Sequence, residues 1–237
     1  MLGALAVAQV AYAQLPERHV QRATKAIVGL FLAASTAEAI DARGRRRGVA
    51  LVAAAGIVGF AAEVAGVRTG RPFGHYAYSD RLGRRVAGVP VAAAAAWAMM
   101  ARPAWATAGL IDRRRPARVP LAAAALTAWD VFLDPRMVRD GAWHWPGGGR
   151  YEGVPASNFA GWLLTATAVF AVWALVDGDD DPRDGSGDGA LALYAWTWAG
   201  EAFANAAIWR RPRVAAAGTA AMGAFALPAL RARLRAA

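Results

Sequence analysis

The chain has 237 residues, of which 57% are hydrophobic and none is cysteine, so disulfides, thiolate metal sites and cysteine nucleophiles are excluded. Its formal net charge of +10 comes almost wholly from arginine, and the arginines gather in short clusters between apolar runs. That pattern is typical of loops that contact anionic lipid headgroups, and it argues against a nucleic-acid-binding face.

Eight apolar runs follow one another along the chain, several of them about 17–20 residues long with few charges, which is the length of a membrane-spanning helix. We therefore predict an all-α, polytopic transmembrane bundle of seven or eight helices that forms a single integral membrane domain, residues 1–237. The fourth run extends to Ile111 if it continues past Pro103. The runs lie at about 2–13, 24–40, 49–67, 89–100, 119–133, 159–176, 190–209 and 214–230.

The number of spanning helices and their orientation both stay open at this point. The first run closes with AYAQ, as before a signal-peptidase site, but no basic residue precedes it, so a short or tilted helix is favoured. If that run is removed or does not span, seven helices remain. Arginines are comparably numerous on both sides of the predicted spans, so the positive-inside rule predicts no orientation.

An acidic, glycine-rich segment, residues 177–189, separates the sixth and seventh runs. We predict a solvated, flexible loop here. A calcium loop is the less favoured alternative, because the EF-hand spacing and its closing glutamate are absent.

A short repeat relates two parts of the chain. GVPVAAAAAW (residues 88–97) and GVPASNFAGW (residues 153–162) share G-V-P with a tryptophan at the same distance. Each follows an aromatic loop, and each loop follows a run with an acidic residue near its end. Because two spans separate the copies, we predict that both loops lie at one membrane face over one pocket; chance is the alternative.

The strongest candidates for chemistry are Asp130 and Asp134, which share one face of a helix at a spacing of four residues. Pro135 disfavours helical geometry at Asp134, so we predict that the helix ends there. Both carboxyl groups then lie near the negative end of the helix dipole, beside each other and in apolar surroundings, which favours the protonated acid needed for general acid catalysis. In the alternative, Asp134 caps a turn and pairs with Arg136 or Arg139.

Other polar residues inside the runs are second-line candidates. Glu63 lies in the third run, and Glu201 with Asn205 forms a pair four residues apart in the seventh. Acidic residues inside spans usually mark a pathway or site, although ion pairs with arginines on neighbouring helices are an equal alternative. His75 and His144 lie in the two aromatic loops, where packing is favoured over metal binding.

Aromatic residues crowd the same two loops and their flanking runs. An interfacial aromatic belt explains some of them, and a pocket for an extended apolar ligand, whose ring faces also steady a carbocation, explains the rest. The candidates for substrate binding are Tyr76, Tyr78, Trp129, Trp143, Trp145, Tyr151 and Trp162.

Five motifs together resemble the CruF-type carotenoid biosynthesis proteins, which are membrane-embedded carotenoid 1,2-hydratases. They are FGHYAY, LGRRVAGVP, AWDVFLDPRMV, GAWHW and YEGVPASNFAGW, and the resemblance is strong from about Glu63 to Trp162. It implies addition of water across the terminal double bond of an acyclic carotenoid, with no redox cofactor and no metal. The implied partners are the carotenoid (C40 or C50), membrane lipids and other carotenoid biosynthesis enzymes, in the cell membrane.

Hydration of such an end group proceeds through a tertiary cation, so it needs a protonated acid, a positioned water and aromatic faces. We predict Asp130 or Asp134 as the acid. The water is oriented or deprotonated by the other aspartate of the pair, by Glu63 or by Glu201. Asn158 holds that water or a carboxylate.

Two alternatives remain at this point. An intramembrane prenyltransferase uses aspartates to hold magnesium and diphosphate, and Asp130, Asp134 and Asp140 imitate one such motif, but a second aspartate-rich helix end is missing. A carotenoid- or lipid-binding protein or a transporter explains the aromatic residues but not the carboxylates beside them.

Overall fold

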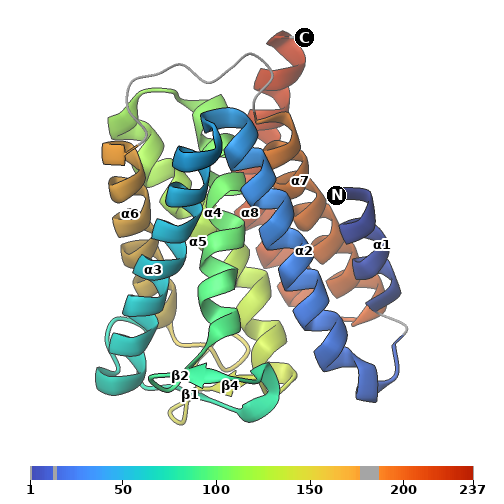
Figure 1. The fold of residues 1–237 in the computed structure, drawn as a ribbon. Coiled ribbons are helices and arrows are strands. Elements are labelled where there is room, and N and C mark those ends of the chain that lie inside the picture. Colours follow the sequence, from blue (N-terminus) through green and yellow to red (C-terminus); the bar gives the residue numbers. More distant parts are fainter. Residues whose placement is uncertain (1, 13–14, 177–186, 237) are drawn as a thin grey trace.

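A computed structural model describes residues 2–12, 15–176 and 187–236, and within them it forms a bundle of eight α-helices (Figure 1). This confirms the predicted all-α class. Residues 177–186 of the predicted acidic loop lie outside the described residues, and α7 begins at Asp188. The α-helices are α1 Leu2–Tyr12, α2 Glu17–Arg43, α3 Arg45–Thr69, α4 Val91–Ile111, α5 Arg115–Arg139, α6 Ala156–Val176, α7 Asp188–Phe203 and α8 Pro212–Ala236.

Short elements complete the described chain. The loop between α3 and α4 contains β1 (Ala77–Tyr78), the 3-10 helix η1 (Asp80–Leu82), β2 (Arg85–Val86) and β3 (Val89–Pro90). The loop between α5 and α6 contains β4 (Trp143–His144), and the π-helix η2 (Ala204–Ile208) continues α7.

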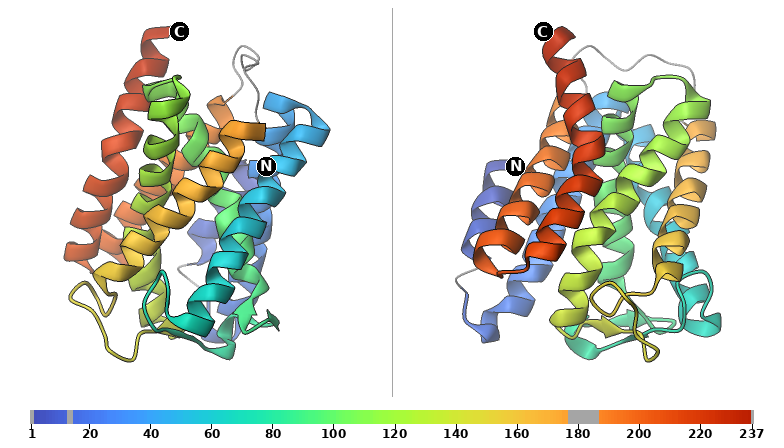
Figure 2. Two further views of the ribbon diagram at one scale, coloured as in Figure 1. Left: turned by 90° about the vertical axis from the view of Figure 1, so that its left-hand side faces the viewer. Right: turned by 180° about the vertical axis from the view of Figure 1, so that it is seen from behind.

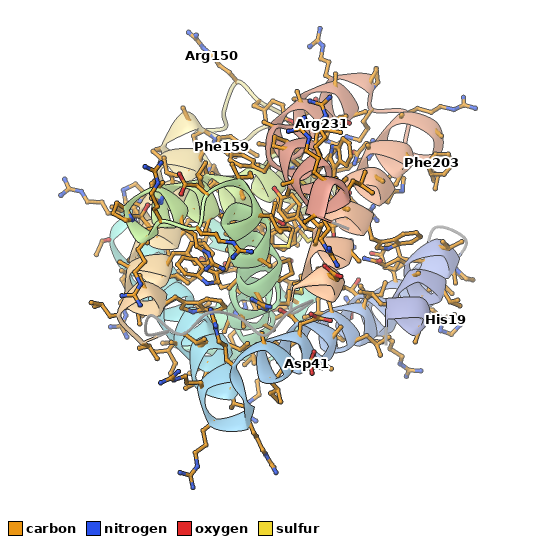
Figure 3. The ribbon with its side chains drawn as sticks, turned by 90° about the horizontal axis from the view of Figure 1, so that it is seen from above. His19, Asp41, Arg150, Phe159, Phe203 and Arg231 are labelled. Atoms are coloured by element: carbon orange, nitrogen blue, oxygen red, sulfur yellow. The ribbon has the colours of Figure 1, made fainter. Side chains whose placement is uncertain are left out.

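Within the described residues, four helices are long and apolar enough to cross a membrane. Large apolar side chains face outward from the bundle, among them Leu175, 84% exposed, and Phe203, 65% exposed, which points away from the helices in Figure 3. Such an apolar outer surface suits contact with lipid. The four segments are His19–Arg43, Arg45–Thr69, Ala156–Val176 and Pro212–Ala236.

The helix α4 lies at the centre and packs against α2, α3, α5, α7 and α8. Neither α4 nor α5 is among the four apolar segments, since α4 carries Arg102 and α5 carries Asp130 and Asp134. All three side chains are buried. Polar residues are tolerated in these two helices because neighbouring helices cover them.

The prediction that a helix ends at Asp134 is wrong, because α5 runs on through Pro135 to Arg139. Proline has no N–H, so the carbonyl of Val131, four residues earlier, loses its helical donor. The hydroxyl of Tyr151 replaces that donor at 3.0 Å. Burial raises the pKa of Tyr151 to about 12, so this hydroxyl keeps its proton near neutral pH. A side chain from the next loop thus allows the helix to continue.

Tyr151→Phe is expected to lower the free energy of unfolding by about 1–3 kcal/mol, because the Val131 carbonyl is left without a donor. Tyr194→Phe is the matched control: its hydroxyl donates to the Ala125 carbonyl at 2.9 Å, but that carbonyl also has the regular helical N–H of Trp129. Its expected loss is about 0.5–1.5 kcal/mol. Thermal unfolding in detergent measures both, and a smaller loss for Tyr151→Phe would contradict the assignment.

The two copies of the sequence repeat also share a backbone conformation. Ala87 and Gly88 have φ angles of 51° and 86°, and Glu152 and Gly153 have 54° and 86°. Two successive positive φ angles define the tight turn that joins paired strands with their natural twist. The first turn joins β2 to β3, the second joins Tyr151 to Val154, and α4 and α6 begin directly afterwards.

The two aromatic loops lie together at one end of the bundle, as predicted (Figures 1 and 2). Strand β1 of the first loop pairs antiparallel with β4 of the second, with Ala77 opposite His144 and Tyr78 opposite Trp143. Backbone pairing therefore fixes the position of one loop relative to the other.

Candidate active site

Asp130 and Asp134 lie one turn apart on the buried face of α5, and their side chains are held by one amide. Asn158 of α6 donates from Nδ2 to Oδ2 of Asp130 at 2.9 Å and also to Oδ2 of Asp134. Trp143 of β4 donates to Oδ1 of Asp134 at 3.0 Å. The alternative pairing of Asp134 with Arg136 is wrong, because Arg136 binds Asp140 at 2.6 Å.

Glu63 is the third buried carboxyl group, and three aromatic side chains bind it. The hydroxyls of Tyr76 and Tyr78 donate to Oε2, the latter at 2.8 Å, and the indole of Trp97 donates to Oε1 at 3.1 Å. Burial and the negative charge of Glu63 raise the pKa of both tyrosines, so they remain protonated donors. Glu63 is therefore held by neutral donors and not by the arginine of the alternative interpretation.

Glu63 and one of the two aspartates line the same cavity, which has a volume of about 30 Å³. Glu63, Asp134 and Asn158 line it, whereas Asp130 does not. This volume accommodates one water molecule, and the polar groups around it supply hydrogen-bond partners. The remaining lining is largely aromatic: Phe73, Tyr76, Tyr78, Trp97, Trp143, Trp145 and Trp162.

The repeat brings two equivalent tryptophans face to face. Trp97 and Trp162 occupy the same position in the two copies, and their rings stack at 4.1 Å between centroids with an interplanar angle of 22°. Trp129 packs edge-on behind Trp162 at 6.2 Å. The wall of the cavity is thus built by the same position of each repeat.

Five of the seven predicted substrate-binding aromatics line the cavity and two do not. Trp129 packs against Trp162, and the Tyr151 hydroxyl donates to the Val131 carbonyl of α5. Phe73 and Trp97 line the cavity but were not among the predicted residues. The repeat contained the signal for Trp97, since its equivalent Trp162 was predicted.

Glu201 belongs to a different cluster. It accepts a hydrogen bond from Asn205 at 3.2 Å, where the π-helix η2 begins, and Arg136 acts on it electrostatically. It does not line the cavity. His75 and His144 are exposed on the loop surface. Among the described residues, no group of three or more His, Asp or Glu side chains has the arrangement of a metal site.

The stacked tryptophans depend on a glycine in α3. A Cβ atom at Gly59 would lie 2.2 Å from Cγ of Trp97, whereas one at Gly56 would lie 3.4 Å from its nearest neighbour, the Ala94 carbonyl oxygen. Gly59→Ala is therefore expected to lower the free energy of unfolding by about 1–3 kcal/mol through overpacking. Gly56→Ala, the matched control, is expected to change it by less than about 1 kcal/mol.

Thermal unfolding and tryptophan emission measure the effect of the two glycine variants. A shifted emission spectrum is expected for Gly59→Ala alone, since its methyl group displaces Trp97. Equal stability of the two variants would contradict the close packing of Gly59 against this ring.

Comparison with known proteins identifies the family. A family model described as carotenoid biosynthesis protein matches residues 21–225. The chain belongs to this family. The match covers every residue of the cavity and both copies of the repeat, and it confirms the resemblance found in the sequence motifs.

A curated relative, the bisanhydrobacterioruberin hydratase of Haloarcula japonica, is 33% identical over 130 residues. The match covers 53% of the present chain and 44% of the relative, so it extends over less than half of the relative's length. No solved structure matches the chain.

Proposed function

We propose that this protein is a multi-pass carotenoid hydratase of the cell membrane that adds water to the terminal double bond of an acyclic carotenoid. The observation that carries the proposal is the water-sized cavity lined by one aspartate of a pair, by a separately held glutamate and by an aromatic shell. The family and the name of the curated relative support the same reaction.

The aspartate pair supplies the proton. Two carboxyl groups that share one amide donor in a buried site do not both carry a charge, so the pair retains a proton. Asp134 lines the cavity and faces the substrate, whereas Asp130 lies behind it with its Oδ1 buried and without a hydrogen-bond partner among the described residues. Asp134 therefore donates, and Asp130 is the positioning residue that helps to keep the proton on the pair.

Protonation of the less substituted alkene carbon uses the two π electrons to form a C–H bond and leaves a tertiary cation at the neighbouring carbon. Trp97, Trp162 and other aromatic side chains line the same cavity. Aromatic faces stabilise an adjacent cation, and the apolar surroundings limit side reactions.

Water in the cavity then forms a C–O bond to the cation. Glu63 accepts the proton that this water loses, because three donors hold its carboxylate as an acceptor at the same cavity that Asp134 lines. The net change is addition of one water with no oxidation or reduction. Proton return to Asp134 completes the cycle.

The rival prenyltransferase requires a cluster of aspartates for magnesium. Asp140, the third aspartate of the imitated motif, instead binds Arg136 and does not line the cavity. A transporter can also use buried carboxyl groups, but it moves the carotenoid without adding the mass of water.

Expression in a host that accumulates an acyclic carotenoid, followed by mass spectrometry of the pigments, tests the proposal. The expected product gains the mass of one or two waters, and growth in ¹⁸O-labelled water labels each new hydroxyl. The same experiment with C40 and C50 substrates distinguishes chain length and the number of ends hydrated. Unchanged pigment, or a gain of prenyl mass that magnesium chelation abolishes, would refute hydration.

A further inference from the structure

A second cavity, of about 390 Å³, is not used by the proposed reaction. It lies between α2, the N-terminal part of α4 and the end of α5, and we call it the α2–α4 groove. Its apolar wall includes Val28, Gly29, Leu32, Val91, Ala92 and Ala95. Charged side chains, among them Lys25, Arg81 and Asp140, gather where the groove meets the loops.

The groove adjoins the water-sized cavity along two helices. On α4, Ala92 lines the groove and Ala96, one turn later, lines the small cavity. On α5, Met137 lines the groove and Leu133, one turn earlier, lines the small cavity. Residues four apart share a helix face, so each helix offers one continuous surface from groove to cavity.

The shape of the groove suits an extended apolar chain. The α2 residues that line it run from Val20 to Leu32, a length of about 18 Å at 1.5 Å per residue. Small residues, Gly29, Ala92 and Ala95, form part of the wall. The water-sized cavity, at about 30 Å³, is too small for an isoprenoid chain, so the chain must lie outside it.

We propose that the α2–α4 groove seats the part of the isoprenoid chain that adjoins the reacting end group, while the end group meets Asp134 at the edge of the water-sized cavity. This inference rests on the proposed function. It commits to one occupant, the acyclic carotenoid itself, because the apolar groove continues along α4 and α5 to the small cavity where the carotenoid is proposed to react.

Gly29 offers a direct test. A Cβ atom at this position meets no atom within 4 Å, so a larger side chain projects into the groove without a clash at its root. Gly200 of α7 is the matched control: it is also a helical glycine whose Cβ would meet nothing within 4 Å, and it lies outside the groove.

The experiment compares Gly29→Phe with Gly200→Phe in two assays. The first measures kcat and KM for lycopene, an acyclic carotenoid, in detergent or vesicles. Gly29→Phe is expected to raise KM about tenfold with kcat nearly unchanged, since the phenyl ring displaces part of the chain from apolar contact. Gly200→Phe is expected to leave both constants within about twofold of wild type.

The second assay measures lycopene retained by purified protein in an Asp134→Asn background, where turnover does not interfere. Gly29→Phe is expected to reduce the retained pigment about tenfold relative to this background, and Gly200→Phe to leave it unchanged. Unchanged KM and unchanged retention would overturn the groove assignment. Loss of co-purified phospholipid with lycopene retained would also overturn it, because the groove would then be a lipid site.

The two proposals fail separately. If wild-type protein adds no water but Gly29→Phe still reduces lycopene retention, hydration is refuted and the groove stands as a carotenoid site. If hydration occurs and Gly29→Phe changes neither assay, the groove assignment fails alone. A fall in kcat with unchanged KM and unchanged retention overturns the groove assignment too, because it indicates damage at the reacting groups.

Discussion

Asp134→Asn is expected to lower the hydration rate by about 10²–10⁴-fold, the usual contribution of a general acid. The amide has nearly the same shape as the carboxyl group, but it does not donate a proton to an alkene. Its oxygen still accepts from Trp143 or Asn158, so the loops keep their positions. Hydrated carotenoid formed per unit of folded protein is the measurement, with thermal unfolding as the check on folding.

Two further aspartate variants serve as a comparison and a control for Asp134→Asn. Asp130→Asn is expected to cause a smaller loss, because Asp130 does not line the cavity and acts by keeping the proton on the pair. Asp112→Asn, the control, changes an aspartate at the other end of α4 that binds Arg114, and full activity is expected. Undiminished hydration by folded Asp134→Asn would remove this residue from the reaction.

Glu63→Gln is the second variant with a large expected effect, a fall in rate of about 10²–10³-fold. Glutamine keeps an oxygen for the Trp97 indole, and its NH₂ group meets tyrosine hydroxyls, which can rotate to accept. The site is thus filled without the carboxylate to which we assign the proton from water. Incorporation of ¹⁸O from labelled water into the carotenoid measures the loss.

Glu201→Gln distinguishes between the two glutamates considered from the sequence. The structure places Glu201 beside Asn205 and Arg136 and outside the cavity, so hydration is expected to remain within about threefold of wild type. A loss as large as that of Glu63→Gln would show that the second cluster takes part in the reaction.

The two expected effects have different physical origins. In the proposed mechanism Asp134 shares a proton with a neighbouring carboxyl group, whereas Glu63 is surrounded by neutral donors that suit a carboxylate. The proposed reaction therefore uses similar side chains as acid and as base, because the fold gives them different partners. Glu63 comes from α3 and the aspartates come from α5, the helices that precede the two copies of the repeat.

The sequence by itself determined the features that depend on local spacing. Apolar runs of membrane-spanning length predicted the helices, since each helix must bury or present its own apolar surface. The four-residue spacing predicted that Asp130 and Asp134 share a face, and the shared G-V-P with its tryptophan predicted that both aromatic loops meet. These conclusions require only the geometry of one helix or one turn.

Only the tertiary structure decided which side chains meet across helices. Trp97 binds Glu63 from 34 positions away, and Asn158 binds both aspartates from another helix. Glu201 instead binds Asn205, outside the cavity. Even the length of α5 depends on a distant contact, because the Tyr151 hydroxyl replaces the donor that Pro135 lacks. Such partners are set by how the helices pack, and the spacing of residues along one chain segment does not contain that information.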